Sequence, residues 1–396
     1  MRIAVPQAVE EIIETLTSCG YEAYAVGGCV RDSLLGREPG DWDITTSASP
    51  FQVKEIFRRT VDTGILHGTV TVMKNHVGYE VTTYRIDGEY EDGRHPKSVA
   101  FTSDLKEDLC RRDFTVNAMA YRHETGIVDI FGGMEDLQRG VICCVGNPVD
   151  RFTEDALRIL RAIRFSAQLG FVIEEKTRAA IEKIAPNLMK VSRERVQVEL
   201  TKLLLSPHPE QIREVYDLGI SPYVSAAFHR ADIKNLCIPS SLPEEKAVRW
   251  SAFLKNEDRE AVISVLKDLK MDNATIDAAA VLTQWIHREI AEDKAEIRRT
   301  MSQMEPELFD RLLCLRTCLG CSGTERLKEL TGQIRQAGDC IYLKDLAVTG
   351  KDLLNCGMRP GKQVGTVLSG LLDEVLEHPE QNRKDVLLRR VFPEQG

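Results

Sequence analysis

The chain has 396 residues, 43% hydrophobic and 29% charged, which is ordinary for a soluble protein with two or three core-bearing units. No apolar run approaches the length needed to cross a bilayer, and the first residues have no secretory pattern, so we expect a cytoplasmic protein without membrane contact. Eleven scattered cysteines, an odd number, do not form the framework of a disulfide-rich small domain. The net charge of −9 argues mildly against binding of nucleic acid. Residues 151–202, however, hold eleven Lys and Arg against seven Asp and Glu, and a local excess of positive charge is enough to attract nucleic acid.

Residues 23–47 read AYAVGGCVRDSLLGREPGDWDITTS, a strand-like run, a Gly-Gly turn opening a short helix, and a second strand-like run. We expect Asp41 and Asp43 in this second run, where residues i and i+2 point to the same face. Two carboxylates aimed at one point suit a hard cation such as Mg2+, which keeps positions for water and phosphate. Backbone amides near Gly28, with Arg31, can hold those phosphates. Taken alone, an Asp-x-Asp is more often a solvated turn.

Residues 69–86 contain two alternating runs around a turn at 74–78, which predicts a β-hairpin. Glu80 lies in the second run, where a glutamate is unfavourable unless the edge is wet or the carboxylate is used. From this run alone, an exposed strand glutamate is the better interpretation. Together with Asp41 and Asp43, Glu80 gives three acids on neighbouring strands, which suits two-metal phosphoryl or nucleotidyl transfer.

Residues 85–109 are polar and contain glycines and a proline, so we expect a mobile surface loop. In the following stretch, 109–121, the spacing of apolar residues predicts a helix with one buried side. Arg111 and Arg112 in this stretch cannot both be buried without partners. One of them can face a phosphate, because a guanidinium fork fits phosphate oxygens.

Strand signals stop after Pro148, and amphipathic stretches broken by Pro and Gly run to the end of the sequence. The fold class we expect is therefore α+β, with an N-terminal mixed sheet followed by an all-helical remainder. Within residues 154–165 a predicted helix carries four charged residues at every third position. These residues are Asp155, Arg158, Arg161 and Arg164. A solvated, salt-bridged row is the ordinary interpretation of such a pattern.

Five longer blocks occur in a characteristic order. They are VGGCVRDSLLG with GDWDI, RRDFTVNAMAY (111–121), IVDIFGGMEDLQRGVI (127–142), EDALRILRAIRF (154–165) and SRERVQVEL (192–200). In these blocks the chain resembles the class II nucleotidyltransferases, most closely the bacterial CCA-adding enzymes, which are tRNA nucleotidyltransferases. The blocks span about the first half, and residues 346–376 match more weakly. The resemblance implies a nucleotidyltransferase head (1–147), a nucleotide-selecting neck (148–205), a body (206–290) and a tRNA-binding tail (291–396).

The resemblance also implies a role for each candidate residue. Asp41 and Asp43 would be the catalytic metal ligands for Mg2+, with Glu80 assisting. The nucleotide-binding set would be Gly28, Arg31, Arg112, Asp155, Arg158, Arg161 and Arg164. Asp155 and Arg158 would read the incoming base, because an acceptor beside a donor fork can mimic a Watson–Crick edge. The implied reaction adds C, C and A from CTP and ATP to the acceptor end of tRNA and releases pyrophosphate.

Three alternatives remain at this point. A poly(A) polymerase shares head and neck but usually adds a long basic extension, which is absent here. An A-only enzyme has nearly the same blocks, whereas Asp92-Gly93-Arg94 in the loop disfavours a CC-only enzyme. A non-catalytic RNA-binding relative would be expected to lose Asp41-x-Asp43 and the EDxxR pattern at 154–158, and both are intact. The sequence leaves the oligomeric state open, a homodimer included.

Overall fold

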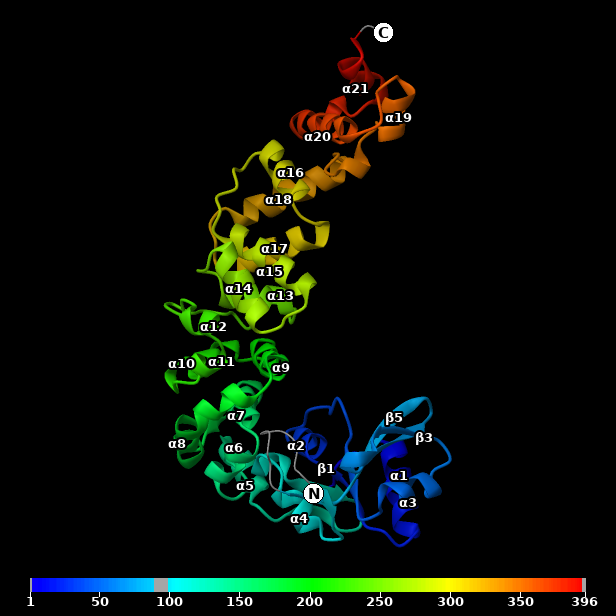
Figure 1. The fold of residues 1–396 in the computed structure, drawn as a ribbon, viewed down its shortest axis with the longest axis vertical. Helices are drawn as coiled ribbons and strands as arrows, with labels where there is room; N and C mark the ends of the chain where they lie inside the picture. The colour runs from blue at the N-terminus through cyan, green and yellow to red at the C-terminus, as the bar shows by residue number, and fades with distance from the viewer. Residues whose placement is uncertain (1, 89–98, 394–396) are drawn as a thin grey trace. The chain divides into compact units, whose positions relative to one another are not determined.

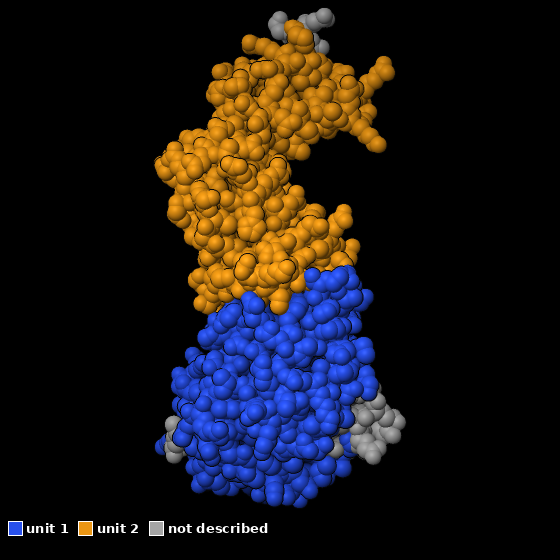
Figure 2. Space-filling model, turned by 90° about the vertical axis from the view of Figure 1, so that its left-hand side faces the viewer, with its two compact units in different colours: residues 1–230, 268–270 blue, residues 231–267, 271–396 orange. Residues whose placement is uncertain are grey.

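The structure, a computed structural model, describes residues 2–88 and 99–393. The chain divides into two compact units, residues 1–230 with 268–270 and residues 231–267 with 271–396 (Figure 2). This division is coarser than the four parts expected from the resemblance.

The first unit is built on a mixed sheet, drawn in blue and cyan in Figure 1. In the described part of the chain its seven strands follow the order β3-β4-β5-β2-β1-β8-β9. In chain order they are β1 (Ala23–Val26), β2 (Ile44–Thr46), β3 (Thr60–Gly64), β4 (Thr69–Lys74), β5 (Val77–Thr83), β8 (Met119–Arg122) and β9 (Gly126–Asp129). The β2–β5 pair is parallel and the other neighbours are antiparallel, which confirms the predicted mixed sheet.

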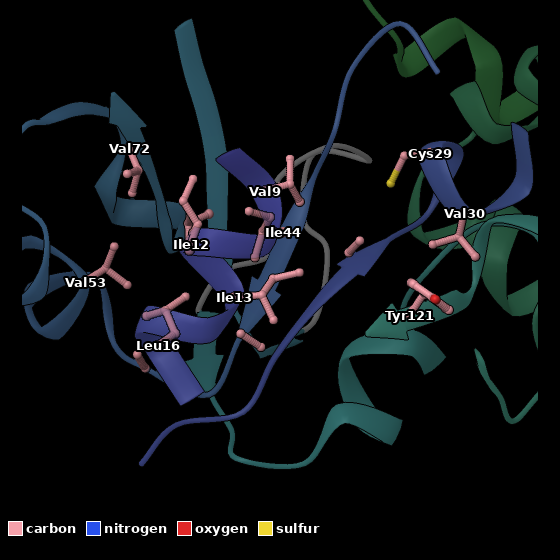
Figure 3. Packing of buried hydrophobic residues seen from close by; sticks show 14 of the residues in the cluster. Val9, Ile12, Ile13, Leu16, Cys29, Val30, Ile44, Val53, Val72 and Tyr121 are labelled. Carbon is pink, nitrogen blue, oxygen red and sulfur yellow. The ribbon is translucent and has the colours of Figure 1, made fainter. Parts of the chain in front are cut away.

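The predicted hairpin is β4 and β5, joined by Asn75 and His76. Both turn residues have positive φ, 50° and 66°, as a two-residue hairpin turn of the primed type requires. Two helices, α1 (Gln7–Ser18) and α3 (Pro50–Ile56), cover one face of the sheet, and their apolar side chains gather around Ile44 (Figure 3). This packing fixes β2, and with it the segment that precedes β2.

Two local predictions between the hairpin and β8 were wrong in the residues that the structure describes. The stretch 109–121 is not a helix, because α4 (Leu105–Cys110) ends at its start and a short 3-10 turn (Thr115–Asn117) leads into β8. β8 lies between β1 and β9, so pairing on both edges overrides the local helical spacing. The expected loop is a paired segment at its ends, β6 (Arg85–Asp87) with β7 (Val99–Phe101). Asp92-Gly93-Arg94 lies outside the described residues.

The rest of the first unit is mainly helical. Its elements are α2 (Gly28–Leu34), α5 (Gly133–Arg139), β10 (Val141–Ile142), α6 (Pro148–Glu154), α7 (Leu157–Leu169), β11 (Val172–Ile173), α8 (Glu175–Ile184), α9 (Arg193–Leu204), α10 (Glu214–Asp217), α11 (Ser221–Val224) and α12 (Ala226–Arg230), with 3-10 turns at Ile65–His67, Ala185–Lys190 and Pro209–Arg213. The two-residue strands β10 and β11 pair in parallel, a feature too short for the sequence to reveal. α7 packs against α9, so these two helices present their charged faces together.

The second unit has only helices in its described residues. They are α13 (Lys246–Phe253), α14 (Arg259–Asp268), α15 (Asn273–Ile286), α16 (Lys294–Ser302), α17 (Pro306–Cys318), α18 (Thr324–Ala337), α19 (Gly350–Asn355), α20 (Lys362–Glu377) and α21 (Lys384–Val391), with 3-10 turns at Leu343–Asp345 and Pro379–Gln381. The predicted order, an α+β head followed by a helical remainder, is confirmed. None of the described helices is long and apolar enough to cross a membrane.

Candidate active site

Asp41 and Asp43 lie directly before β2, not inside a strand as the alternation predicted. The backbone nevertheless continues the pairing by one residue, because the Val26 amide donates to the Asp43 carbonyl at 3.0 Å. Both carboxylates line a cavity of about 430 Å³. The predicted juxtaposition of the two side chains is therefore present, although the strand starts later.

Glu80 is placed beside Asp43 by the parallel pair β2–β5. Ile44 is the register partner of Val81, so the preceding residues, Asp43 and Glu80, are neighbours across the two strands and share a face. Desolvation raises the pKa of Glu80, and the charges of Asp43 and Asp41 raise it further. Desolvation also raises the pKa of Asp43, while Arg112 counteracts the rise and Asp41 adds to it. The three carboxylates thus form one negatively charged cluster.

The Gly-Gly turn brings the backbone close to Arg112. Gly27 has φ = 83°, and a Cβ there would lie 2.9 Å from Arg112 Nη1, so only glycine fits without strain. Gly28 begins α2, as predicted, and it lines the cavity. A Cβ at Gly28 would meet Arg31 Nη2 at an ordinary 3.7 Å. The turn therefore places the start of α2 at the cavity of the carboxylates, and the absence of a side chain at Gly27 leaves room for Arg112.

Arg31 is buried, and its guanidinium is already engaged within the protein. Its Nε and Nη2 donate to the two oxygens of Asp32, each at 2.9 Å, and Nη1 donates to Asn117 Oδ1 at 2.5 Å. Asp32 lines the cavity. The predicted contact of Arg31 with phosphate stays a prediction, whereas its observed contacts hold Asp32 and the 3-10 turn in place.

Arg111 and Arg112 share one buried carboxylate partner, Asp108, so neither guanidinium is buried without a partner. Arg111 donates to Asp108 Oδ1 at 2.7 Å, and Arg112 Nη2 lies 3.6 Å from Asp108 Oδ2. Burial lowers the pKa of Arg112, against the charge of Asp108. Its Nε is buried without a hydrogen-bond partner among the described residues. Arg112 nevertheless lines both cavities, so its guanidinium is placed beside a ligand that enters them.

A second cavity, of about 270 Å³, contains the predicted base-reading pair. It is lined by Arg111, Arg112, Asp113, Asp155, Leu157, Arg158, Arg161 and Arg195. Arg112, Asp113 and Arg161 also line the cavity of the carboxylates, so the two cavities adjoin at these residues. A ligand can therefore extend from the carboxylates to the pair.

Asp155 is not on the predicted helix. It lies at a break between α6 and α7, where its Oδ1 accepts the Leu157 amide at 3.0 Å. Its Oδ2 accepts from Arg195 Nη2 at 2.7 Å. The predicted continuous helix was wrong at this point, because Asp155 is the C-cap of α6 in extended backbone and its side chain accepts from an amide of the next helix instead of lying inside one helix.

Arg158, in the first turn of α7, is held at several points. It donates to Glu154 Oε2 at 2.5 Å and to the carbonyls of Arg151 and Arg111, each at 3.0 Å. These contacts fix the guanidinium fork at the cavity that Asp155 also lines. A donor group and an acceptor group therefore stand at the same cavity, each pre-oriented by other residues.

Arg161 and Arg164, further along α7, each have a buried carboxylate partner. Arg161 Nη2 lies 2.5 Å from Asp113 Oδ2, and Arg164 Nε donates to Glu199 at 2.5 Å. Burial alone would raise the pKa of Asp113, but Arg161 outweighs it and lowers the pKa to about 2. Arg161 lines both cavities and Arg164 lines the larger one. The ordinary interpretation, a solvated row of charges on a helix surface, is therefore wrong for Arg161 and Arg164.

Sequence reasoning missed three residues of α9 that complete the site. Arg195 holds Asp155, Glu199 holds Arg164, and Lys202 lines the larger cavity. The only signal was their spacing of four and three residues in the block 192–200 and just beyond it. That spacing predicts that the residues share one helix face. It does not predict the partners of Arg195 and Glu199, which lie 35 or more positions away in the sequence.

The carboxylates of the larger cavity suit a divalent metal ion that keeps other ligands besides protein. Within residues 2–88 and 99–393, no group of three or more His, Cys, Asp and Glu has the arrangement of a complete protein cage. Asp41 and Asp43 do line one cavity, and their mutual repulsion is what a cation would relieve. Two carboxylates fit Mg2+, which is usually bound by one or two of them plus water and phosphate.

Comparison with known proteins finds three family models along the chain. The model “Poly A polymerase head domain” matches residues 23–143. The model “Probable RNA and SrmB- binding site of polymerase A” matches residues 170–227, and the model “tRNA nucleotidyltransferase domain 2 putative” matches residues 242–391. These three ranges follow one another with short gaps and account for most of the chain.

Relatives that match nearly the whole chain are CCA-adding enzymes. The chain is 37% identical over 385 residues to the CCA-adding enzyme of Levilactobacillus brevis, covering 96% of both. It is 38% identical over 389 residues to that of Geobacillus kaustophilus, covering 94% of this chain and 93% of the relative. The crystal structure of the Bacillus stearothermophilus CCA-adding enzyme in complex with CTP superposes with a TM-score of 0.83 at 32% identity, covering 98% of each chain.

Proposed function

The chain belongs to the family of CCA-adding enzymes, and from this membership we propose that it adds C, C and A to the 3′ end of tRNA, using CTP and ATP without a template. The observation that carries the proposal is the pair of adjoining cavities, one with Asp41 and Asp43 and one with Asp155 and Arg158. A nucleotide that spans them has its base at the second pair and its phosphates at the first. We expect the enzyme to act in the cytoplasm, where tRNA and both nucleotides are present.

Nucleotidyltransferases of this kind generally depend on divalent metal ions, and we propose Mg2+ here. Asp41 and Asp43 would hold it, with Glu80 supporting them as a neighbouring acceptor. Bound there, the metal would supply charge for the phosphates and acidify the attacking hydroxyl. Arg112 supplies positive charge from the protein itself near these carboxylates. Its charge acts to lower the pKa of Asp43, against the larger effect of burial, which raises it.

The reaction follows from this placement. The 3′-hydroxyl oxygen of tRNA forms a bond to the α-phosphorus, the bond from the α-phosphorus to the bridging oxygen breaks, and pyrophosphate leaves. The hydroxyl proton passes to solvent or to a carboxylate of the cluster. The residues of the two cavities align the reactants and offset their charge, which are the two main sources of rate in such a transfer.

Base selection follows from donor and acceptor order. Cytosine and adenine each present an amino donor beside a ring-nitrogen acceptor on the Watson–Crick edge. Asp155 offers an acceptor and Arg158 a donor fork, so both bases match while uracil and guanine place a carbonyl where the carboxylate lies. Such a site discriminates strongly, because a wrong base leaves desolvated groups unpaired.

The four-part division fits this scheme and is part of the proposal. Residues of the proposed head (1–147) and neck (148–205) line both cavities, while the proposed body (206–290) and tail (291–396) would bind tRNA. A homodimer stays a prediction that the native mass in solution would test.

The deciding experiment uses tRNAs that end one, two or three nucleotides short of the mature 3′ end. Each is incubated with CTP alone, ATP alone, or both, and the products are resolved at single-nucleotide length. Complete CCA synthesis on the shortest tRNA supports the proposal. Addition of A only, or of long A tails, would instead identify an A-adding enzyme or a poly(A) polymerase, and binding without extension a non-catalytic relative.

A further inference from the structure

The wall of the larger cavity carries one cation that has no partner among residues 2–88 and 99–393. Four cationic side chains line this cavity, namely Arg112, Arg161, Arg164 and Lys202. The three arginines have the carboxylate partners described above. Lys202 is exposed, and its side chain makes no ion pair or hydrogen bond with any part of the chain that the structure describes. Its ammonium group is therefore available to a ligand.

One face of α9 runs along both cavities. Arg195, Glu199 and Lys202 follow at spacings of four and three residues, which places them on the same side of the helix. Arg195 lines the smaller cavity and Lys202 the larger. Their separation of seven residues corresponds to about 10 Å along the helix axis. A nucleotide with its base beside Arg195 and Asp155 would thus have its phosphates toward Lys202.

The charge of the larger cavity indicates which ligand atoms Lys202 would bind. Besides Asp41 and Asp43, the cavity is lined by Asp32 and Asp113, so an anion entering it meets mostly negative groups or neutralised arginines. In addition to the Mg2+ and Arg112 proposed above, a triphosphate therefore gains from a cation that is not already paired. A lysine supplies a mobile point charge with three donors, which suits a phosphate chain whose position changes during the reaction.

We propose that Lys202 binds the β- and γ-phosphates of the incoming nucleotide and remains with the pyrophosphate when it leaves. This inference rests on the proposed function. Breaking the bond between the α-phosphorus and the bridging oxygen leaves the electron pair on that oxygen, so negative charge accumulates on the leaving pyrophosphate. The ammonium group offsets this charge. The bland alternative is that Lys202, in the last turn of α9, only stabilises the carboxyl end of its helix.

The test compares Lys202→Ala and Lys202→Arg with Lys183→Ala, an exposed lysine in the last turn of α8. The control removes the same charge from an equivalent helix position outside the cavity. Dissociation constants are measured for CTP and for inorganic tripolyphosphate, which has no base, in the absence of tRNA. The affinity for tRNA is measured in the absence of nucleotide.

We expect Lys202→Ala to weaken CTP and tripolyphosphate by the same factor, about fivefold or more, and to leave tRNA affinity unchanged. Lys202→Arg should restore most of the loss, and Lys183→Ala should have no effect. Unchanged affinity for both phosphate probes would overturn the inference, as would a loss of tRNA affinity alone, which would assign Lys202 to a tRNA phosphate. Failure of the unaltered protein to extend tRNA would instead overturn the proposed function.

Discussion

Arg195 donates to the carboxylate of Asp155 at 2.7 Å, across 40 residues of sequence, and both side chains line the cavity proposed for the base. The other oxygen of Asp155 is fixed by the Leu157 amide. The carboxylate is therefore pre-oriented before a nucleotide arrives. Asp155 would present its remaining lone pairs to an amino group of the base.

Arg195→Ala should lower selectivity without removing the acceptor itself. With one support lost, Asp155 can rotate, and the preference for C over U and for A over G should fall about tenfold. Arg195→Lys should retain more of the preference, since it can still donate to Asp155. Competition between all four nucleotides on one tRNA measures this, and a uniform loss of all incorporation would indicate a merely structural role.

Asp155→Ala and Arg158→Ala should relax selectivity more severely than Arg195→Ala. Each variant removes a group that is proposed to contact the base. The incorporation of UTP and GTP relative to that of CTP and ATP should therefore rise, while nucleotide transfer itself continues. A surface salt bridge would instead change stability by about 0 to 1 kcal/mol and leave the preference alone. Glu182→Ala, an exposed change on α8, serves as the control. Unchanged ratios in both variants would refute base reading by this pair.

Asp41→Ala or Asp43→Ala should abolish incorporation while tRNA binding persists. The two carboxylates line one cavity and are the proposed metal ligands, so loss of either one removes half of that pair. Glu80→Gln should be impaired to a smaller extent, because Glu80 is exposed beside Asp43 and not among the residues lining the cavity. Single-turnover extension and a gel-shift assay separate the two effects, with Asp62→Ala as an exposed control on β3. More than a tenth of normal incorporation in either variant would exclude an essential role for that carboxylate.

Gly27→Ala should be far more damaging than Gly28→Ala, although the residues are adjacent. Gly27 has φ = 83°, which costs about 1–2 kcal/mol with a side chain, and its Cβ would press on Arg112. Gly28 lies in ordinary helical backbone with only a loose contact to Arg31. Thermal unfolding and the KM for CTP of both variants provide the comparison. Equal effects would show that the approach of Arg112 to the turn is not required.

The sequence predicted those features of the site that are carried by local patterns. Asp41 with Asp43 and the hairpin that holds Glu80 follow from residue types a few positions apart. The structure places Asp41 and Asp43 at one cavity and Glu80 beside Asp43 on the neighbouring strand. The partners of Arg31 and Asp155 were not predicted, because Asn117 and Arg195 lie 86 and 40 positions away. Periodicity shows that a charged side chain lies on a helix face, but only the tertiary packing shows which opposite charge it meets.

The ion pair between Asp113 and Arg161 should make stability depend on pH in an acidic window. The pKa of Asp113 falls from 3.8 to about 2 in the folded protein, against the cost of burial, because Arg161 favours the charged carboxylate. A lowered folded-state pKa means that the stabilisation is complete above the unfolded value and is lost as the pH falls toward 2. Above pH 5 the surroundings of Asp113 as a whole, with the cost of burial, Arg161, Arg158 and Asn117 included, should contribute about 2 kcal/mol.

A double-mutant cycle with Asp113→Asn and Arg161→Met isolates this contribution, because it removes the cost that each single change causes by leaving a buried partner uncompensated. Urea unfolding at pH 7, 5, 4 and 3 should give a constant coupling energy at the first two values and a declining one below pH 4. Coupling that is the same at pH 7 and pH 3 would show that Asp113 does not titrate in this range. Since Arg161 lines both cavities, the same loss of charge on Asp113 should loosen the junction between them, and nucleotide affinity should fall in the same window.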